Sequence, residues 1–259
     1  MLGFVCLYAL FVEPRWVEVT HTRVGIKDLG PGLEGVRIAL VSDVHRGPWT
    51  GRGFIEAAAD RINAERPDIL ALAGDFVHHS DKYAEDAVAP FGKVRAPLGK
   101  FAVLGNHDHW EGADTVRAAL RRHGIELLEN RHRIVSRNGA SLCIAGVEEY
   151  WEGHPDAAAA LRGVDDAIPR ILMVHNPDYV NEIPVPVRID LALAGHTHGG
   201  QVILPFFGPL LVPVHGAFVS GLQQTARARI YVTRGLSEIA PPLRFRCRPE
   251  ISMMVLSGR

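Results

Sequence analysis

The feature that most constrains this chain is a series of short, uninterrupted apolar runs rich in Val, Ile, Leu and Ala. Runs that are apolar at every position, instead of at alternate positions, are typical of β-strands covered on both faces. The seven clearest runs span residues 36–41, 69–73, 101–104, 142–145, 171–174, 191–194 and 230–232. The chain is therefore predicted to fold around sheets that have other layers packed on both sides.

Helical patterns lie between the early runs and indicate an α/β fold. They cover residues 53–66, 82–91 and 113–123, and Asp114 is placed to cap the last one. After residue 133 the chain becomes dense in strands, and residues 134–143 predict a hairpin that turns at Asn138-Gly139. Two packed sheets with outer helices fit both halves. We expect one domain over residues 36–259, preceded in residues 1–35 by an apolar segment and a lead-in strand.

Polar side chains that bind metals follow five of the apolar runs directly. They are, in chain order, Asp43, His45, Asp75, Asn106, His107, Asp108, His175, His196 and His198. In an open α/β sheet the binding crevice lies at the carboxyl ends of the strands, so these groups are expected to converge. Asp43 with His45, and His196 with His198, are two residues apart, and an extended chain would point both members of each pair to the same side.

A metal centre explains this coincidence better than separate structural contacts do. An unpaired buried polar group costs roughly 1–3 kcal/mol, and a structural explanation would need a different partner at each of the five strand ends. Carboxylate, imidazole and amide ligands without sulfur suit Mn, Fe or Zn. Seven ligand side chains among these nine exceed what one ion uses, so we expect two divalent ions bridged by a shared carboxylate and about 3.5–4 Å apart.

The ordered set resembles the motifs of the calcineurin-like metallophosphoesterase superfamily, from residue 36 to about residue 256. The matching motifs are Asp43-Val44-His45, Gly74-Asp75, Gly105-Asn106-His107-Asp108, His175 and Gly195-His196-Thr197-His198. The resemblance implies a four-layer α/β/β/α sandwich with a dinuclear site at the strand ends. It implies that one ion is held by Asp43, His45, Asp75 and His198, and the other by Asp75, Asn106, His175 and His196. Asp75 would be the bridge, and His107 would face the leaving group.

The chemistry expected of such a site is hydrolysis of a phosphoester. Two cations lower the pKa of a bridging water, so that hydroxide can attack in line, and they neutralise charge on the phosphoryl oxygens. His107 can donate a proton to the departing alkoxide or stabilise charge there. In the protein-phosphatase branch this histidine pairs with an aspartate three residues after the bridging one, where this chain has His78. That departure argues against a protein phosphatase.

Further motifs resemble a bacterial, membrane-associated branch that includes phosphodiesterases and enzymes similar to the UDP-diacylglucosamine pyrophosphatases. They lie in residues 106–114, 195–209 and 244–250, and Glu148-Glu149 stand where that branch often has two aspartates. The resemblance implies a phosphodiester or pyrophosphate substrate that is lipid-linked or part of the cell envelope. The alternatives are a nuclease or cyclic-nucleotide phosphodiesterase of the same fold, and a metal-binding scaffold without catalysis.

Residues 1–12 (MLGFVCLYALFV) are apolar and uncharged. A membrane-spanning helix needs roughly 20 residues, and this segment also lacks the basic start and cleavage site of a secretory signal. One interpretation is a first strand or a loose end, which is compatible with a cytoplasmic protein. The other is an interfacial anchor or the remnant of a longer membrane segment, which predicts a membrane-associated protein with a peripheral membrane contact.

Several aromatic residues also lie beyond the strand ends: Trp49, Trp110, Trp151 and Phe206-Phe207. Large aromatic side chains usually anchor loops to a core, and we favour that interpretation here. If they instead rim the pocket, the substrate has an apolar or ring-bearing part.

Arginine alternates with other residues near the carboxyl terminus, at positions 244, 246 and 248. On a strand these three side chains would share one face, and we expect a solvated edge strand. The alternative is a patch for anionic lipid headgroups.

Charge and cysteine content argue against two other classes of protein. With 28 basic and 29 acidic residues the formal net charge is -1, which gives no basic field to hold nucleic acid, so no nucleic-acid partner is expected. Cys6, Cys143 and Cys247 are too few and too far apart for a disulfide framework or a cysteine zinc site, and we expect them to be buried apolar residues.

Overall fold

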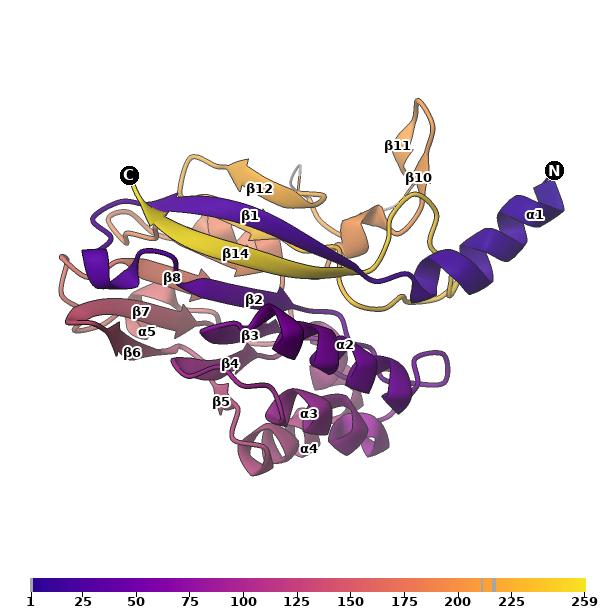
Figure 1. Ribbon diagram of the computed structural model, residues 1–259, viewed down its shortest axis with the longest axis horizontal. Coiled ribbons are helices and arrows are strands. Elements are labelled where there is room, and N and C mark those ends of the chain that lie inside the picture. The colour runs from indigo at the N-terminus through magenta and orange to yellow at the C-terminus, as the bar shows by residue number, and fades with distance from the viewer. Residues whose placement is uncertain (1, 211, 216–217) are drawn as a thin grey trace.

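Two six-stranded sheets packed face to face form the centre of the computed structural model, which describes residues 2–210, 212–215 and 218–259 (Figure 1). The first sheet has the order β1-β14-β2-β3-β4-β5, with β2 to β5 parallel. Its strands are β1 (Glu18–Ile26), β2 (Arg37–Val41), β3 (Ile69–Ala73), β4 (Gly99–Val103), β5 (Glu126–Leu127) and β14 (Glu250–Gly258).

The second sheet has the order β12-β13-β9-β8-β7-β6. Strands β7, β8, β9 and β13 are parallel, and β6 and β12 flank them in the antiparallel direction. The strands are β6 (Arg131–Arg137), β7 (Ala140–Gly146), β8 (Arg170–Met173), β9 (Leu191–Ala194), β12 (Gly221–Gln224) and β13 (Arg229–Val232). A separate small hairpin consists of β10 (Ile203–Leu204) and β11 (Gly208–Pro209).

Helices cover the outer face of each sheet. The first sheet carries α2 (Arg52–Glu65), α3 (Ala84–Gly92) and α4 (Asn106–Arg122), with the short turns η3 (Pro31–Leu33) and η4 (Asp81–Tyr83) nearby. The second sheet has a thinner cover made of α5 (Ala157–Ala160) and the 3-10 helix η5 (Pro177–Glu182), and η6 (His198–Gly200) follows β9. The amino-terminal helical segment, α1 (Leu2–Leu7), η1 (Tyr8–Val12) and η2 (Glu13–Arg15), projects from the body (Figure 1).

Three separate apolar clusters fill the spaces between the layers. Ile55, Val88 and Val116 belong to the cluster between the first sheet and its helices, which also contains Ala39 of β2 and Leu72 of β3. A second cluster lies between the two sheets, and a third lies under the outer cover of the second sheet. Three interfaces define four layers, so the expected α/β/β/α sandwich is confirmed.

All seven apolar runs form strands, with bounds that differ from the prediction by no more than a few residues. Every residue of β3 is buried, because helices cover one face of the sheet and the second sheet covers the other. The predicted hairpin is also confirmed as β6–β7. Its turn residues Asn138 and Gly139 have φ of 50° and 76°, the left-handed conformation that two-residue hairpin turns require.

The structure corrects two expectations about helices. The helix expected at residues 113–123 is the second part of α4, which begins earlier, at Asn106, and is interrupted at Gly112, where φ is 145°. Asp114 is therefore not its cap; the carboxylate of Asp108 accepts the Gly105 N–H at 2.9 Å instead. Residues 2–12 are helical, so the first-strand interpretation is wrong, and the helical path continues through the 3-10 turn η2 and ends at Arg15.

Candidate metal centre

The predicted ligands gather where the carboxyl ends of strands from both sheets meet. Asp43 and His45 follow β2, Asp75 follows β3, His175 follows β8, and His196 follows β9. The parallel strands of each sheet run in one direction, so their ends share one edge, and face-to-face packing brings the two edges together. This edge lies at the end of the molecule from which α1 projects (Figure 1).

The chain turns sharply at the ligand pairs and is not extended there, contrary to the expectation from the sequence. Five ligands have positive φ, between 41° and 70°: Asp43, His45, Asp75, His196 and His198. This conformation is uncommon for residues other than glycine and costs of the order of 1–3 kcal/mol each. Backbone hydrogen bonds from Asp43 N to Gly74 O and from His45 N to Asp75 O, both 3.0 Å, hold the turns in place.

Asp43, His45 and His198 form one group of three buried potential ligands. His198 Nε2 lies 3.5 Å from Asp43 Oδ1, and His45 Nε2 lies 4.0 Å from the same oxygen. The Nε2 atoms of the two histidines are 3.2 Å apart. One ligand atom from each residue lies within 4.8 Å of the others, a spacing that allows all three to reach one ion.

Asp75, His175 and His196 form the second group, and Asp75 connects it to the first. Asp75 Oδ2 is 3.2 Å from His175 Nε2 and 3.4 Å from His45 Nε2. His196 Nδ1 is 3.1 Å from His175 Nε2. A carboxylate that faces histidines of both groups has the position of a bridging ligand.

Asn106 lies beside this second group at the start of α4. The backbone N–H of the next residue, His107, donates to Asp75 Oδ1 at 2.9 Å, which leaves Oδ2 to face the histidines. The Asn106 Oδ1 atom is buried and makes no hydrogen bond with the part of the chain that the structure describes. A buried amide oxygen without a partner is costly, and a cation would satisfy it.

The outward ring nitrogens of three ligand histidines contact carbonyl oxygens. His175 Nδ1 lies 2.7 Å from Ala73 O, His198 Nδ1 lies 3.1 Å from Ser237 O, and His196 Nε2 lies 3.0 Å from Pro213 O. Only an N–H can donate to a carbonyl, so the inward nitrogens of His196 and His198, whose pKa values are lowered by burial, carry lone pairs, and His175 would present one when a bound cation displaces its inward proton. Lone pairs and carboxylates that face one another suit a cation, so these residues fit a metal centre.

The pKa shifts also indicate that this site favours positive charge. Burial would lower the pKa of His175, yet the Asp75 carboxylate raises it to about 10. Burial would raise the pKa of Asp75, but the charges of His175 and His45 outweigh it and hold the pKa well below its usual value. Burial and the charge of His175 lower the pKa of His196 to about 3, which keeps that ring neutral.

Asp108, which the sequence placed among the polar side chains at the strand ends, is a structural residue of the site and its carboxylate oxygens accept backbone N–H groups. Besides capping α4, its buried carboxylate accepts the N–H groups of Asp75 at 2.9 Å, Phe76 at 2.7 Å and Val77 at 3.2 Å. It therefore ties the turn after β3 to the turn after β4. Its position at the third residue of a helix that follows a glycine is the sequence signal that could have identified it.

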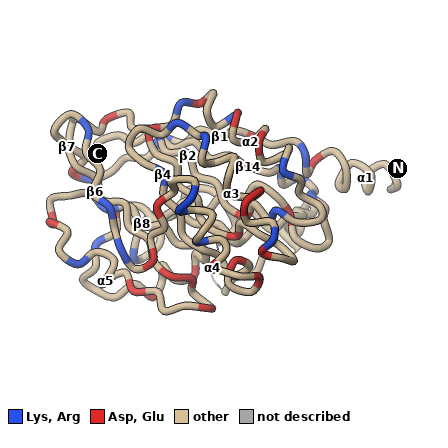
Figure 2. Tube along the Cα trace, turned by 90° about the horizontal axis from the view of Figure 1, so that it is seen from below, with Lys and Arg blue, Asp and Glu red and all other residues tan. Residues whose placement is uncertain are grey.

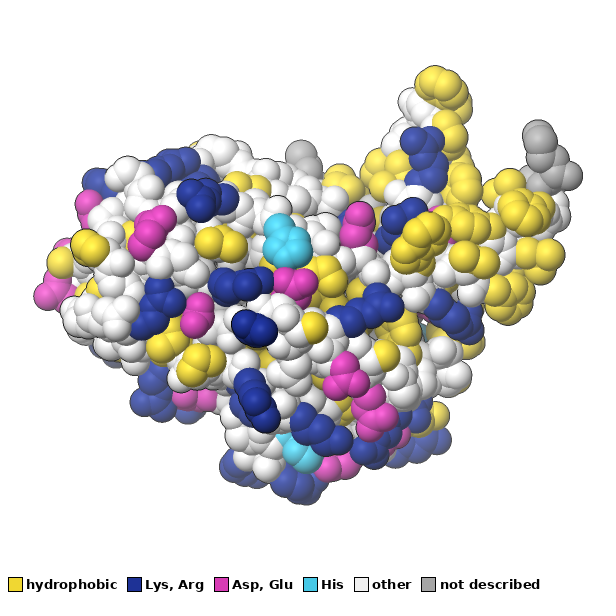
Figure 3. Space-filling model, viewed as in Figure 1, with side chains coloured by type: hydrophobic (Ala, Val, Ile, Leu, Met, Phe, Trp, Pro, Cys, Tyr) yellow, Lys and Arg dark blue, Asp and Glu magenta, His cyan; other side chains and the backbone are white. Residues whose placement is uncertain are grey.

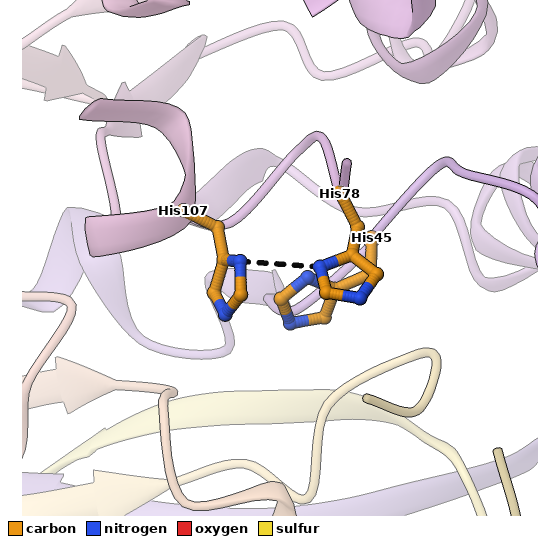
Figure 4. A group of neighbouring side chains, drawn as sticks. All are labelled: His45, His78 and His107. Atoms are coloured by element: carbon orange, nitrogen blue, oxygen red, sulfur yellow. Dashed lines mark hydrogen bonds between the residues drawn. The ribbon is translucent and has the colours of Figure 1, made fainter. Parts of the chain in front are cut away.

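His107 lies next to the ligands and contacts His78, the residue in place of the expected aspartate. Their Nδ1 atoms are 3.2 Å apart, and the other ring nitrogen of His107 points away from His78 (Figure 4). Burial and the neighbouring histidines His107 and His79 lower the pKa of His78 to about 4, so His78 is neutral near pH 7. A neutral His78 can accept a hydrogen bond from His107 and orient its ring.

Three tryptophans surround the site and do not simply anchor loops, contrary to the interpretation we favoured. The Trp110 ring lies 4.8 Å from His107, and the Trp151 ring lies 4.6 Å from His196, measured between centroids. Trp49 lies 5.7 Å from His78. Each is between 41% and 53% exposed, so none of the three is fully packed into the core. By contrast, Phe206 and Phe207 project into solvent on the β10–β11 hairpin.

The arginine segment near the carboxyl terminus is not a strand, and Arg244 is not solvated. Its guanidinium is buried and donates to carbonyl oxygens, among them those of His198 at 3.3 Å and Arg234 at 2.8 Å, and also that of Ser237. Arg244 therefore supports the turn that carries His198. Cys143 and Cys247 are buried as expected, whereas Cys6 is exposed on α1.

Comparison with known proteins agrees with this geometry. A family model described as calcineurin-like phosphoesterase matches residues 36–200. The uncharacterized metallophosphoesterase YkuE of Bacillus subtilis is 33% identical over 97% of this chain and 89% of its own length. Phosphodiesterase YaeI of Escherichia coli is 30% identical over 96% of this chain and 92% of its own length.

A protein of Bos taurus named transmembrane protein with metallophosphoesterase domain is 31% identical over 93% of this chain, which spans only 57% of that protein. Among the residues described here, each helix falls short of the length and apolar character needed to cross a bilayer. The structure of Haemophilus influenzae NAD nucleotidase shares the fold, with a TM-score of 0.52 at 14% identity over 78% of this chain and 50% of that one. With the paired ligand groups and the four layers, these matches establish that the chain belongs to the calcineurin-like phosphoesterase family and is a metal-dependent phosphoester hydrolase.

Proposed function

We propose that the protein is a dinuclear metallophosphodiesterase that cleaves a phosphodiester or pyrophosphate bond in a lipid-linked substrate. The observation that carries this proposal is the carboxylate of Asp75, which faces histidines of both ligand groups at 3.2 and 3.4 Å. One ion would be held by Asp43, His45, Asp75 and His198, and the other by Asp75, Asn106, His175 and His196. When bound, two Mn, Fe or Zn ions supply an activated water and neutralise charge on the phosphoryl oxygens.

His107 is the proposed catalytic residue on the leaving-group side. It is partly exposed beside the buried ligands, so it can reach a substrate that they bind. A histidine with its Nδ1 engaged by His78 presents Nε2, which can protonate the departing oxygen or stabilise its charge.

The three tryptophans support a substrate with an apolar or ring-bearing part. Trp49 and Trp151 come from loops and Trp110 from the first turns of α4, and their rings lie next to three different histidines, His78, His196 and His107. Indole rings at these positions could contact an apolar or ring-bearing part of a bound phosphoester. A relative named as a phosphodiesterase supports a diester over a monoester. The exposed apolar helix at residues 2–12 supports association with a membrane, where a lipid-linked substrate would be found.

The test compares hydrolysis of bis-p-nitrophenyl phosphate and p-nitrophenyl phosphate by chelator-stripped protein, with and without added Mn²⁺. We expect metal-dependent turnover that favours the diester, and we expect Asp75→Ala and His196→Ala to abolish it. His21→Ala is the matched control, because His21 is an exposed histidine on β1 outside the site. Activity retained by the Asp75→Ala or His196→Ala protein would refute the assignment. If the two variants are inactive, turnover of lipid and UDP-sugar diesters by the wild type would define the substrate class.

A further inference from the structure

Two apolar projections leave the body of the molecule at the same end. One is the helical segment of residues 2–12, where Phe4 is 76% exposed and Leu7 and Phe11 are also exposed. The other is the β10–β11 hairpin, where Phe206 and Phe207 are 105% and 85% exposed. Figure 3 shows apolar side chains gathered on both projections, and Figure 2 shows no charged residue along α1. Exposed aromatic side chains in this number on two separate tips indicate a contact surface.

Both projections are attached to one segment of the chain, residues 243–248. Arg244 N donates to Ala9 O at 3.0 Å, and Cys247 N donates to the buried carboxylate of Glu13, so this segment holds the base of the helix. Phe245 N donates to Gln201 O at 3.0 Å and its carbonyl accepts from Ile203 N at 2.9 Å, which holds the base of the hairpin. The two tips are therefore placed relative to each other by the same backbone.

The base of the helical segment carries three arginines around a cavity. A cavity of about 370 Å³ is lined by Tyr8, Glu13, Glu18, Arg234, Arg246 and Arg248. The carboxylate of Glu13 accepts a hydrogen bond from the Cys247 N–H, and Glu18 forms a salt bridge with Arg234 at 2.8 Å. Arg246 and Arg248 form no salt bridge with any acidic group in the described part of the chain. Two arginines without acidic partners beside a cavity suit a phosphate group.

A tryptophan marks the level at which apolar surface gives way to charge. Trp16 follows the helical segment, is 49% exposed, and lies 3.6 Å beneath the guanidinium of Arg248, measured to the ring centroid. Tryptophans with one apolar face and a neighbouring cation are enriched at the boundary between lipid chains and headgroups. The tips are thus apolar, and the base carries arginines together with an aromatic ring, which matches the change from lipid chains to headgroups that a bilayer presents from its interior outwards.

We propose that the two projections insert into one leaflet of an anionic phospholipid bilayer, with Arg246 and Arg248 binding lipid phosphates at their base. Residues 2–12 alone would reach roughly 16 Å at 1.5 Å per residue, about half of the ~30 Å hydrocarbon core. This inference deepens the membrane association and the lipid-linked substrate proposed above. Because Arg244 of the same segment donates to His198 O, the metal centre would be held next to the bilayer surface.

The experiment is co-sedimentation of the full chain with vesicles of phosphatidylcholine alone or mixed two to one with phosphatidylglycerol, at low and high salt. We expect binding to the mixed vesicles, reduced at least tenfold in Phe206→Ser/Phe207→Ser. The Arg246→Gln/Arg248→Gln protein should no longer prefer vesicles with phosphatidylglycerol, and its binding should no longer depend on salt. Affinity for the mixed vesicles should fall about fivefold for each arginine replaced. Matched controls are Val185→Ser and Arg162→Gln, an exposed apolar residue and an exposed arginine in other loops.

Wild-type protein that stays in the supernatant, or a Phe206→Ser/Phe207→Ser protein that sediments like wild type, would overturn the proposal. A dimer that forms without vesicles and is lost in the phenylalanine variant would instead identify a second copy as the occupant, which also overturns it. Hydrolysis of bis-p-nitrophenyl phosphate is measured in parallel and should be unchanged in all four variants. Vesicle binding without hydrolysis by the wild type would retain this surface and reject the proposed function.

Discussion

The ring of His107 is held differently from the rings of its neighbours. The ligand histidines are buried, and carbonyl oxygens fix three of them, whereas His107 is partly exposed and has another histidine at its Nδ1. His45, His78 and His107 come from the turns after β2, β3 and β4 and meet ring to edge (Figure 4). This arrangement leaves one nitrogen of His107 directed away from His78, where it can act on a substrate.

We predict that His107→Gln slows hydrolysis most when the leaving group needs a proton. General acid catalysis contributes about 10²–10⁴-fold, and p-nitrophenolate leaves well without it. The variant should therefore lose much more kcat with a glycerophosphodiester than with bis-p-nitrophenyl phosphate, while its metal content stays normal. Equal losses with the two substrates would contradict a leaving-group function for His107.

We predict that His78→Ala lowers kcat with little change in KM, because His78 orients His107 and does not reach the substrate. His78→Asn should recover part of the loss, since an amide oxygen can accept a hydrogen bond near the position of Nδ1. The effect of a positioning hydrogen bond is expected to be about tenfold, or about 1.4 kcal/mol. A purely structural function of His78 would instead lower the melting temperature of both variants and leave them equally impaired.

His196 predicts how the metal-free protein responds to acid. Its pKa is about 3 in the folded protein against 6.5 for an ordinary histidine, so the unfolded chain binds a proton first as the pH falls. Stability from this residue is therefore present above about pH 6.5 and lost as the pH falls toward 3. Urea titrations of chelator-treated protein at pH 6.5 and pH 4 measure the free energy of unfolding. Between these two pH values it should fall on the order of 3 kcal/mol more in wild type than in His196→Gln. Parallel losses would show that the ring is not held neutral.

At the scale of elements, the site depends on sharp turns that directly follow buried strands. The turn after β9 passes so close to the turn after β2 that there is no room for a side chain at Gly195. A Cβ there would lie 1.9 Å from Ser42 Oγ and 2.7 Å from Asp43 Oδ2. Ser42 in turn donates to Ala73 O at 2.9 Å, so three strand ends are packed around this glycine.

We predict that Gly195→Ala destabilises the protein by about 1–3 kcal/mol or more, the usual cost of overpacking, and weakens metal binding. Gly53→Ala is the matched control, because Gly53 lies in α2 with open space around its Cβ position. That substitution should instead stabilise the protein by about 0.5–1 kcal/mol. Chemical denaturation of both variants measures the difference in sign, and a neutral Gly195→Ala would show that the two turns can separate.

At the scale of the whole molecule, three apolar clusters lie between the four layers, and the polar metal centre lies at one edge of them. Asp43, Asp75, His45 and His175 are all buried there, and carboxylates this close to each other are costly without compensating positive charge. Burial and the Asp75 charge raise the pKa of Asp43 to about 7, although the charge of His175 acts in the opposite direction. Bound cations would offset this cost, so metal occupancy is expected to contribute to global stability.

We predict that removal of metal by a chelator lowers the melting temperature by about 10 °C, and that added Mn²⁺ or Zn²⁺ restores it. A ligand at 1,000 times its Kd stabilises the folded state by about 4 kcal/mol, and each kcal/mol shifts Tm by about 2–4 °C in a chain of this size. Calorimetry of wild type and Asp75→Asn provides the test, because the variant should respond much less to chelation. Identical melting of chelated and metal-loaded wild type would exclude this contribution.

The sequence by itself predicted seven of the strands and the hairpin correctly, and it supplied the seven metal ligands that are proposed here; it did not predict the central strand β14. Uninterrupted apolar runs require burial on both faces, and side chains at the carboxyl ends of parallel strands must share an edge, so local pattern and topology were enough. The His78 position was also visible in the sequence, but its contact with His107 was not. The helical form of residues 2–12 was not predicted, because a short apolar segment is compatible with several structures.

Only the tertiary structure decided which residues support the site and which surround it. Arg244 is buried because its guanidinium finds four carbonyl oxygens from separate segments, and no local pattern encodes such a set. Trp49, Trp110 and Trp151 lie next to histidines of the site because the chain segments that follow strands of both sheets meet at one edge. The sequence specifies what each strand end carries, whereas long-range packing between the two sheets specifies which side chains meet there.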